Sequence, residues 1–553
     1  MLAASVDRSA GELFSGHRAI LDSVADQLRR AMLCVEHTRN ILAPINRLPS
    51  EILCMIFSRV VMDCPRQSQR NHPSRGKHAI QTVCRLWRQI AISFPVLWSE
   101  IELTQRTPTA ALHELLQRAG VVPLQVSVFR ADHLVKYIGP HMHRMQRLEV
   151  TFEKSSTQNM QLSRRFSLLF QPAPFLNGLH VSTHEDDPYL IMMPKLFQGH
   201  APRLSRLSLS RHYLCSTNRF PNLTHLYLSM QYTFSPSSLE DFLDFLEGSP
   251  KLEAIVLEEA GPCILPELLP SFPLSRCVTL SHLRTLVFDV CRWQVIACVL
   301  RHVVPSTHVE IEIVELQQLT LSRELLAILA PGAAFLQHVD DMARLSLWFN
   351  DGQICFTCEG PLAMLKIDMV LDCSLPEPVC GTLASALVAE LPQILPLHSV
   401  TDFRLKIHDF APIWSPAVQG MLQSMLAVQS CTIWIDPSLD KKYWRACLES
   451  RVLGVPLPKL KSLHFVGELP KWWKPFWAMG VAIGRAKRGY RLQELTCTGL
   501  KIGQYVPTFV LWNPETMKIG RQRVMDFVDK VELRAVGSSP MIPPVIHGWD
   551  GML

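Results

Sequence analysis

The stretch Pro202-Arg203-Leu204-Ser205-Arg206-Leu207-Ser208-Leu209 decides the fold, because its Leu-x-x-Leu-x-Leu pattern returns along most of the chain. Alternate side chains of a strand point to opposite faces, so Leu207 and Leu209 predict a buried face and Arg206 and Ser208 an outward one. The clearest further copies also follow a proline, at residues 221–228, 250–257 and 458–465.

One buried position can be chosen in each copy as its anchor, and most gaps between successive anchors are about 19 to 40 residues long. That period predicts an α/β fold in which short parallel strands, joined by helices, stack over residues 104–536. The wide gap between Leu286 and Leu345 fits two units, with Val309-Glu310-Ile311-Glu312-Ile313 between them. The anchors are Leu148, Leu179, Leu207, Leu226, Ile255, Leu286, Leu345, Leu365, Leu405, Ile433, Leu463 and Leu495.

The repeated phrase resembles the leucine-rich repeat, in a degenerate form. That family usually places Asn or Cys three residues after the last leucine, where the side chain satisfies backbone groups of the turn. Only Cys291 conforms among the six positions His212, Gln231, Ala260, Cys291, Glu468 and Leu500. We therefore expect an irregular solenoid with less regular turns.

Residues between the leucines are predicted to line an exposed face of this array, and their mixed size and charge suit recognition of a protein surface. For any one of them, simple exposure to solvent is the alternative interpretation. The candidates for binding a protein target are Arg206, His225, Tyr227, Arg404, Lys406 and His464.

The first 43 residues predict an amphipathic helix. Apolar residues recur in steps of three and four from Leu13 to Val35, and Pro44 ends the pattern. We expect this helix to pack on its own protein, with a coiled coil as the alternative. The stripe consists of Leu13, Ile20, Leu21, Val24, Leu28, Met32 and Val35.

Two further helices are predicted at about residues 49–61 and 80–91, separated by a basic loop over residues 63–78. The segments are Leu48-Pro49-x-Glu51-Ile52-Leu53-x-x-Ile56-Phe57, Val83-Cys84-Arg85-x-Trp87-Arg88-x-Ile90-Ala91 and Pro95-x-Leu97-Trp98. Their order and spacing over residues 44–103 resemble the F-box-like domain frequent in fungal proteins, although the loop is longer than in many F-boxes.

This resemblance implies docking to a Skp-family adaptor and, through it, to a cullin. The chain would then be the non-catalytic substrate-recognition subunit of an SCF-type ubiquitin ligase, with the solenoid binding a protein target. The alternatives are a scaffold acting outside a ligase and an enzyme in the C-terminal part. The expected adaptor-binding residues are Leu48, Pro49, Ile52, Leu53, Ile56, Phe57, Val83, Cys84, Trp87, Ile90, Leu97 and Trp98.

Composition narrows the class of protein. Hydrophobic residues make up 48% of the 553, too many for a mainly disordered chain, and the net charge of +6 is too small to indicate nucleic-acid binding. The longest uncharged window, residues 410–435, is interrupted by prolines and amides, so no membrane partner is expected. The first residues lack a secretory signal, so the 16 cysteines are expected to be reduced thiols in the cytoplasm, the nucleus or both.

Chemical motifs are few. Cys355-Phe356-Thr357-Cys358 has the spacing of a zinc or redox pair, but its alternation favours two packed thiols in a strand, and we expect no metal or cofactor. The aromatic run at residues 471–477 favours a helix anchor over a nucleic-acid or membrane contact. The glycines, prolines and serines after Val536 predict a flexible tail over residues 537–553.

Overall fold

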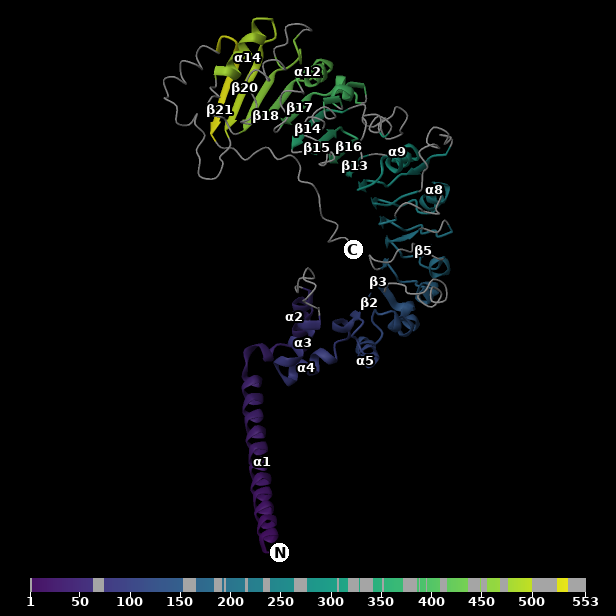
Figure 1. Cartoon of the computed structure of the whole chain (residues 1–553), viewed down its shortest axis with the longest axis vertical. Helices are drawn as coiled ribbons and strands as arrows, with labels where there is room; N and C mark the ends of the chain where they lie inside the picture. Colours follow the sequence, from purple (N-terminus) through teal and green to yellow (C-terminus); the bar gives the residue numbers. More distant parts are fainter. Residues whose placement is uncertain are drawn as a thin grey trace. The chain divides into compact units, whose positions relative to one another are not determined.

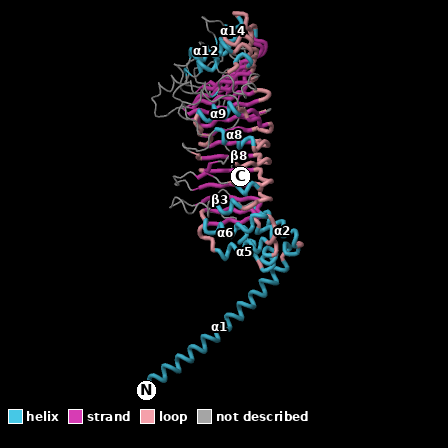
Figure 2. Tube along the Cα trace, turned by 90° about the vertical axis from the view of Figure 1, so that its right-hand side faces the viewer, coloured by secondary structure: helices cyan, strands magenta, loops and turns pink. Residues whose placement is uncertain are grey.

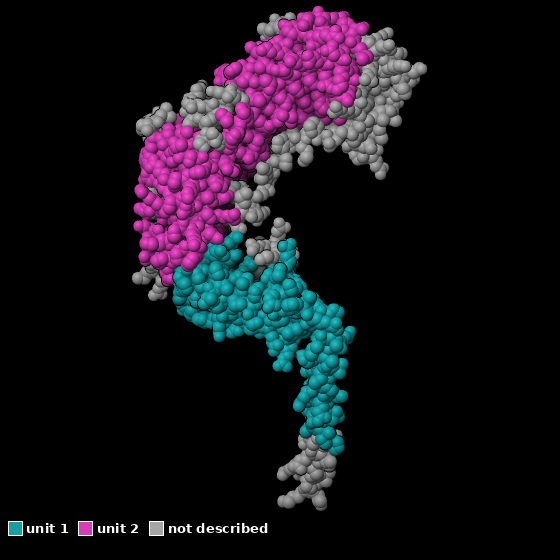
Figure 3. Space-filling view, turned by 180° about the vertical axis from the view of Figure 1, so that it is seen from behind, with its two compact units in different colours: residues 1–153 teal, residues 154–553 magenta. Residues whose placement is uncertain are grey.

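The computed structural model shows a mixed α/β protein with an N-terminal helical region and a large, mostly parallel sheet. It divides into two compact units, residues 1–153 and residues 154–553 (Figure 3). The expected tail at 537–553 and most of the aromatic run lie outside the described residues. The structure describes residues 2–62, 74–152, 166–183, 191–192, 195–213, 217–231, 239–262, 276–305, 308–316, 328, 342–350, 353–370, 385–386, 388–393, 395–407, 415–435, 448, 455–467, 476–499 and 525–535.

Unit 1 joins helices to three parallel strands. Its strands β1 (Glu100–Thr104), β2 (Leu124–Phe129) and β3 (Met145–Phe152) pair in chain order. They therefore belong to the same compact unit as the preceding helices, and the unit ends later than the boundary expected at 103. The helical elements are α1 (Leu2–Leu42), η1 (Pro44–Arg47), α2 (Ser50–Met62), α3 (Ser74–Val83), α4 (Arg85–Ile92), η2 (Pro95–Trp98), α5 (Thr109–Ala119), η3 (Asp132–Leu134), α6 (Val135–Ile138) and η4 (Gly139–Arg144).

The helix expected at 80–91 is in fact two helices. Cys84 takes an extended conformation, with φ −158° and ψ 171°, which separates α3 from α4. Its sulfur accepts a hydrogen bond from the Trp87 amide at 3.5 Å, so the side chain caps α4. The helix also begins earlier than expected, because α3 starts at Ser74, within the segment predicted to be a loop; residues 63–73 of that loop lie outside the described residues.

The prediction that the first helix packs on its own protein is wrong for its described side chains. The apolar stripe of α1 is exposed from Ile20 to Leu42, and Leu28 is 61% exposed. The sequence shows that such a stripe exists, but it does not identify the surface that covers it.

Unit 2 contains most of the sheet. Among the described residues, neighbouring strands pair in the order β4-β6-β8-β9-β11-β13-β16-β15-β14-β17-β18-β19-β20-β21. Figure 2 shows these strands stacked as successive rungs. Their bounds are β4 (Gly178–Thr183), β6 (Arg206–Ser210), β8 (His225–Ser229), β9 (Ala254–Glu258), β11 (Thr285–Asp289), β13 (Val309–Leu316), β14 (Arg344–Asn350), β15 (Gln353–Glu359), β16 (Ala363–Val370), β17 (Asp402–Ile407), β18 (Ser430–Ile435), β19 (Ser462–Gly467), β20 (Leu492–Gly499) and β21 (Val528–Ala535).

The core of unit 2 lies on the sheet face that carries the anchors. Every anchor predicted from the sequence lies in a strand and is at most 2% exposed. In the register, Leu207 lies beside Leu226, which lies beside Ile255, so equivalent side chains form a continuous row. Helices follow several strands (Figure 1), namely α8 (Leu239–Glu247), α9 (Trp293–His302), α12 (Ser415–Ser424) and α14 (Phe476–Ala486).

The turns that follow five of the strands share one backbone conformation. A residue with positive φ follows five of the strands, and its amide donates to a carbonyl at the end of the next strand, as Arg211 does to Ser229 at 2.9 Å. The residues are Arg130, Arg211, Met230, Glu259 and Val290, with φ between 45° and 63°.

Buried polar side chains support these turns, and Cys291 is not alone in doing so. Its Sγ donates to the carbonyl of Leu257 at 3.1 Å, while Gln231 Nε2 donates to the carbonyl of His212 at 2.5 Å. The ring of His212 in turn lies 2.7 Å from the Ser210 carbonyl. Glutamine and histidine side chains thus also contact backbone groups near these turns.

One strand departs from the expected parallel order. Strand β15 runs antiparallel between β14 and β16, whereas β16 pairs parallel with β13 and β14 pairs parallel with β17. Only two residues, Asp351 and Gly352, connect β14 to β15, which is too short for a parallel crossover. Asp-Gly between alternating strands is itself a hairpin signal.

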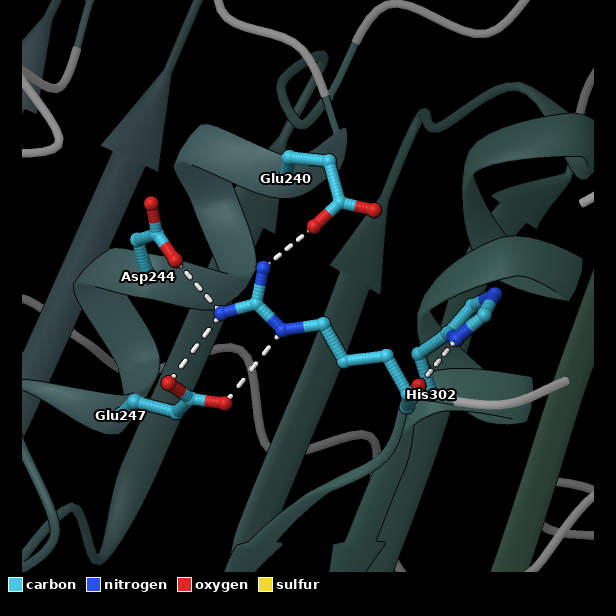
Figure 4. A network of polar contacts seen from close by, with 5 residues as sticks. Glu240, Asp244, Glu247 and His302 are labelled. Carbon is cyan, nitrogen blue, oxygen red and sulfur yellow. Dashed lines mark hydrogen bonds and ion pairs between the residues drawn. The ribbon is translucent and has the colours of Figure 1, made fainter. Parts of the chain in front are cut away.

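A charge cluster fastens α8 to the chain that precedes strand β10 (Val278–Leu280) (Figure 4). The guanidinium of Arg276 contacts three carboxylates on one side of α8, those of Glu240, Asp244 and Glu247. The same residue's carbonyl lies 2.7 Å from Nδ1 of His302. These carboxylates raise the pKa of Arg276, because each of them stabilises the positive charge of the guanidinium.

The lengths and apolarity of the helices bear on membrane insertion. Within the part of the chain that the structure describes, none of them is both long and apolar enough to cross a membrane.

Candidate docking surface

Helix α2 has apolar side chains on two sides. Leu53, Phe57 and Val61, four residues apart, point into unit 1 and are at most 9% exposed. Ile52 and Met55, on the other side of the same helix, are 41% and 68% exposed. A helix that only packs on its own protein has a polar outer face, so this second apolar side is the first sign of a docking surface.

The inner side of α2 fixes the position of α4. The rings of Phe57 and Trp87 pack with their centroids 4.9 Å apart, and Trp87 Nε1 donates to Asn46 Oδ1 at 2.7 Å. Because Asn46 lies in η1, this bond holds the start of α4 beside the segment that leads into α2. Trp98 is buried, and its Nε1 donates to the Ala91 carbonyl at 2.7 Å, which anchors the end of α4.

Several apolar side chains on the elements that these contacts join are exposed to solvent. We call the set Leu48, Ile52, Met55, Val83 and Leu86 the docking surface; each is between 38% and 68% exposed. Arginines on the same elements are also exposed, namely Arg47, Arg59, Arg85 and Arg88. Exposed apolar side chains with mostly basic charges on the same elements suit a partner that carries acidic groups.

The structure divides the twelve expected adaptor-binding residues into three groups. Leu48, Pro49, Ile52 and Val83 are exposed, whereas Ile56, Cys84, Trp87 and Ile90 are half-buried. The other four belong to the core of unit 1 instead of its surface, because neighbouring helices enclose them: Leu53, Phe57, Leu97 and Trp98. Sequence reasoning omitted Met55 and Leu86, although the spacing of Met55 from Ile52 places it on the same side of α2.

The expected target-binding residues share one face of the sheet in unit 2 but form two separate groups. Arg206 lies beside His225 in the register, and Tyr227 follows on the same strand. Arg404 and Lys406 lie on β17, seven strand spacings beyond β8, and His464 lies on β19, nine spacings beyond it, which is roughly 34 Å and 43 Å along the sheet. Only Arg206 is fully exposed; the other five are half-buried.

Local contacts already engage much of this face. Tyr227 donates to Glu258, which together with burial raises the pKa of the phenol. The Lys406 ammonium lies 4.8 Å from the centroid of the Trp348 ring, and His464 Nε2 lies 2.9 Å from Thr498 Oγ1. A target would therefore meet an ordered surface in which these side chains are preorganised.

Charge pairs cross the same face between neighbouring strands. Arg344 contacts Glu359 at 2.6 Å and Asp402 at 2.7 Å, bridging three adjacent strands. Lys366 and Glu312 form a largely buried pair at 2.6 Å. Three of the outward positions are buried, contrary to the prediction of an exposed face, because neighbouring side chains cover them: Ser208, Val287 and Thr496.

The two cysteines with metal-type spacing do not share a face. Cys358 lies with Phe356 on the buried side of β15, and Cys355 lies on the opposite side. Burial raises the pKa of Cys355 to about 12, which keeps this thiol protonated at neutral pH. The pair therefore serves as packing groups of a strand; the downstream Cys373 and Cys380 lie outside the described residues.

No protein-family model matches the chain, and no curated protein matches it either.

Proposed function

We propose that the chain is a non-catalytic substrate-recognition subunit of an SCF-type ubiquitin ligase. Its F-box-like segment, residues 44–103, docks a Skp-family adaptor through the docking surface. Unit 2, a leucine-rich-repeat-like array, binds a protein target. The observation that carries the proposal is the second apolar side of α2, where Ile52 and Met55 stay exposed although Leu53 and Phe57 already supply the core.

The physical support for docking is the excess of apolar anchors. A helix that binds a partner needs side chains at spacings of three and four that its own unit does not bury, and α2 provides them. Leu48 and Pro49 precede the helix and extend the surface. The motif resemblance and the exposure coincide at Leu48, Pro49, Ile52 and Val83; four other motif residues are half-buried and four form the core.

A recruiting role needs binding surfaces on this chain and does not need catalytic residues. A tethered target is presented to the ubiquitin donor at a high effective concentration, and the transfer machinery performs the reaction. The long ordered face of unit 2 suits such a target. The mixed charges and aromatic groups along it favour a protein over a nucleic acid.

Capture of a purified Skp-family adaptor by the full chain tests the docking step. The triple variant Leu48→Asp, Pro49→Asp and Ile52→Asp should lose capture, because charges in a desolvated interface remain unpaired. Val121→Asp is the matched control, since Val121 is exposed in the same unit but lies outside the docking surface, and it should bind normally. Capture that survives the triple variant refutes the assigned surface.

A second experiment separates a ligase subunit from a scaffold. Affinity purification from native cells with the proteasome inhibited should recover a cullin together with bound targets. Those targets should accumulate when the gene is deleted. Adaptor binding without cullin, and with no accumulating protein, indicates the scaffold function instead.

A further inference from the structure

Helix α1 carries an apolar stripe that the rest of unit 1 leaves uncovered. Ile20, Leu21, Val24, Leu28, Met32, Val35 and Leu42 are all between 46% and 69% exposed. Contiguous apolar surface of this kind on a soluble protein marks an interaction site. The docking surface does not include any residue of α1, so this stripe is a separate feature.

The spacing of the stripe identifies the geometry of its partner. Leu21, Leu28, Val35 and Leu42 recur every seven residues, with Val24, Ala31 and Thr38 three residues after the first three of them. A seven-residue repeat keeps a seam facing one partner helix over several turns, as in a coiled coil, whereas packing on a globular surface follows the 3.6-residue period. The helix is 41 residues long, or about 60 Å.

The residues that flank this seam indicate which helix pairs with α1. In a coiled coil of two different chains, complementary charges beside the seam select the partner. Here the flanking positions from 20 to 34 hold no charge, Arg18 and Arg39 occupy flanking positions near the two ends of the seam, and the charged residues between them lie on the far side of the helix. The flanking residues are Ile20, Ala25, Gln27, Met32 and Cys34; the far-side charges are Asp22, Asp26, Arg29, Arg30 and Glu36.

Over residues 20–34, two identical helices can therefore approach without repulsion between like charges. The seam from Leu21 to Leu42 is 22 residues long, or about 33 Å, so the apolar contact extends over that length of each helix. We infer that the chain forms a homodimer through a coiled coil of α1, with a second copy of the same chain as the partner. This inference is independent of the adaptor and would hold if the proposed function failed.

Helix α1 contains its own matched control. Leu28 and Leu33 are 61% and 64% exposed, but Leu28 lies in the seam and Leu33 lies on the opposite side among the charged residues. Aspartate at either position has the same helix propensity. Only Leu28→Asp places charges in a desolvated layer, so only this variant should separate the two copies.

Sedimentation equilibrium of the full chain at micromolar concentration gives the test. Wild type and Leu33→Asp should have twice the chain mass of 62.7 kDa, and Leu28→Asp should have 62.7 kDa. Adaptor capture should be equal in all three proteins. A monomeric wild type, dissociation by Leu33→Asp, or loss of adaptor capture by Leu28→Asp would each overturn the inference, the last by assigning the stripe to the adaptor interface.

Discussion

Three thiols enclosed in the core of unit 2 show what burial does to a titrating group. Loss of hydration raises the pKa of Cys291, Cys431 and Cys497 to about 12. Each of the three is at most 3% exposed. They therefore act as small apolar side chains, and in Cys291 also as a weak hydrogen-bond donor to a turn.

Labelling with a thiol reagent checks this assignment. At about pH 8, iodoacetamide should modify the exposed Cys34 and Cys277 in the native protein and leave these three thiols unmodified until a denaturant is added. Labelling of the three at the rate of Cys34 would contradict their burial.

Alkaline pH should also destabilise unit 2 through these thiols. The native state keeps their protons to higher pH than the unfolded chain, whose thiols ionise at about pH 8.5–9. Between about pH 8 and pH 10 the free energy of unfolding should therefore fall by about 1.5–2 kcal/mol per thiol. The urea midpoint should shift downward over that interval, and Cys497→Ala should show a smaller shift. An equal shift in the variant would argue against this thiol as a cause.

At the scale of elements, several strands of the array are followed by a turn that depends on one residue with positive φ and on a buried polar side chain beneath it. Gln231→Leu keeps the volume but removes the bond to the His212 carbonyl, which should lower the free energy of unfolding by about 1–3 kcal/mol. Thermal or urea unfolding measures this loss. Gln429→Leu makes the same change at an exposed position and is the control, which should change stability little.

The sequence predicts the strands of unit 2 well because a single physical requirement repeats. Positions such as Leu207, Leu226 and Ile255 must be buried in the same register, and the same apolar pattern recurs at the equivalent positions of the other strands. The direction of β15 could have been predicted from Asp351-Gly352, which signals a hairpin. The break at Cys84 could not, since apolar residues continue on both sides of it.

The docking surface is only partly predictable for a related reason. Helix α2 is apolar on both sides, so its pattern does not distinguish Leu53, which is buried, from Ile52, which is exposed. Likewise the stripe of α1 is plain in the sequence, but its burial depends on whether another surface meets it. The periodicity of a sequence identifies the apolar faces of its helices, whereas the tertiary structure determines which of these faces are buried.

At the scale of the whole molecule, the sheet of unit 2 is an array in which each strand pairs with its immediate neighbours. Stability in such arrays is close to a sum of local terms. Arg485 provides a probe at one end, because its buried guanidinium donates to the carbonyls of Pro456 and Leu457 at 2.7 Å each. Burial lowers its pKa to about 10.

Arg485→Met should therefore act locally. It leaves two buried carbonyls without their donors, at a cost of about 2–3 kcal/mol. Hydrogen exchange should become faster in β18, β19 and β20 and stay unchanged in β6, β8 and β9. Lys487→Met, at an exposed position near the end of the same helical segment, should alter neither region. Faster exchange across the entire sheet would show that unit 2 unfolds as one cooperative body.

The reversed order of β14, β15 and β16 sets a condition on biosynthesis. A chain leaving the ribosome can add most rungs one by one, but the edge of β13 has to wait for β16, whose last residue is Val370. Until then β13 presents an open row of backbone donors and acceptors, the kind of edge on which chains associate wrongly. Folding during synthesis should therefore pause between the completion of β13 and that of β16. A nascent chain stalled before Val370 should bind chaperones most readily.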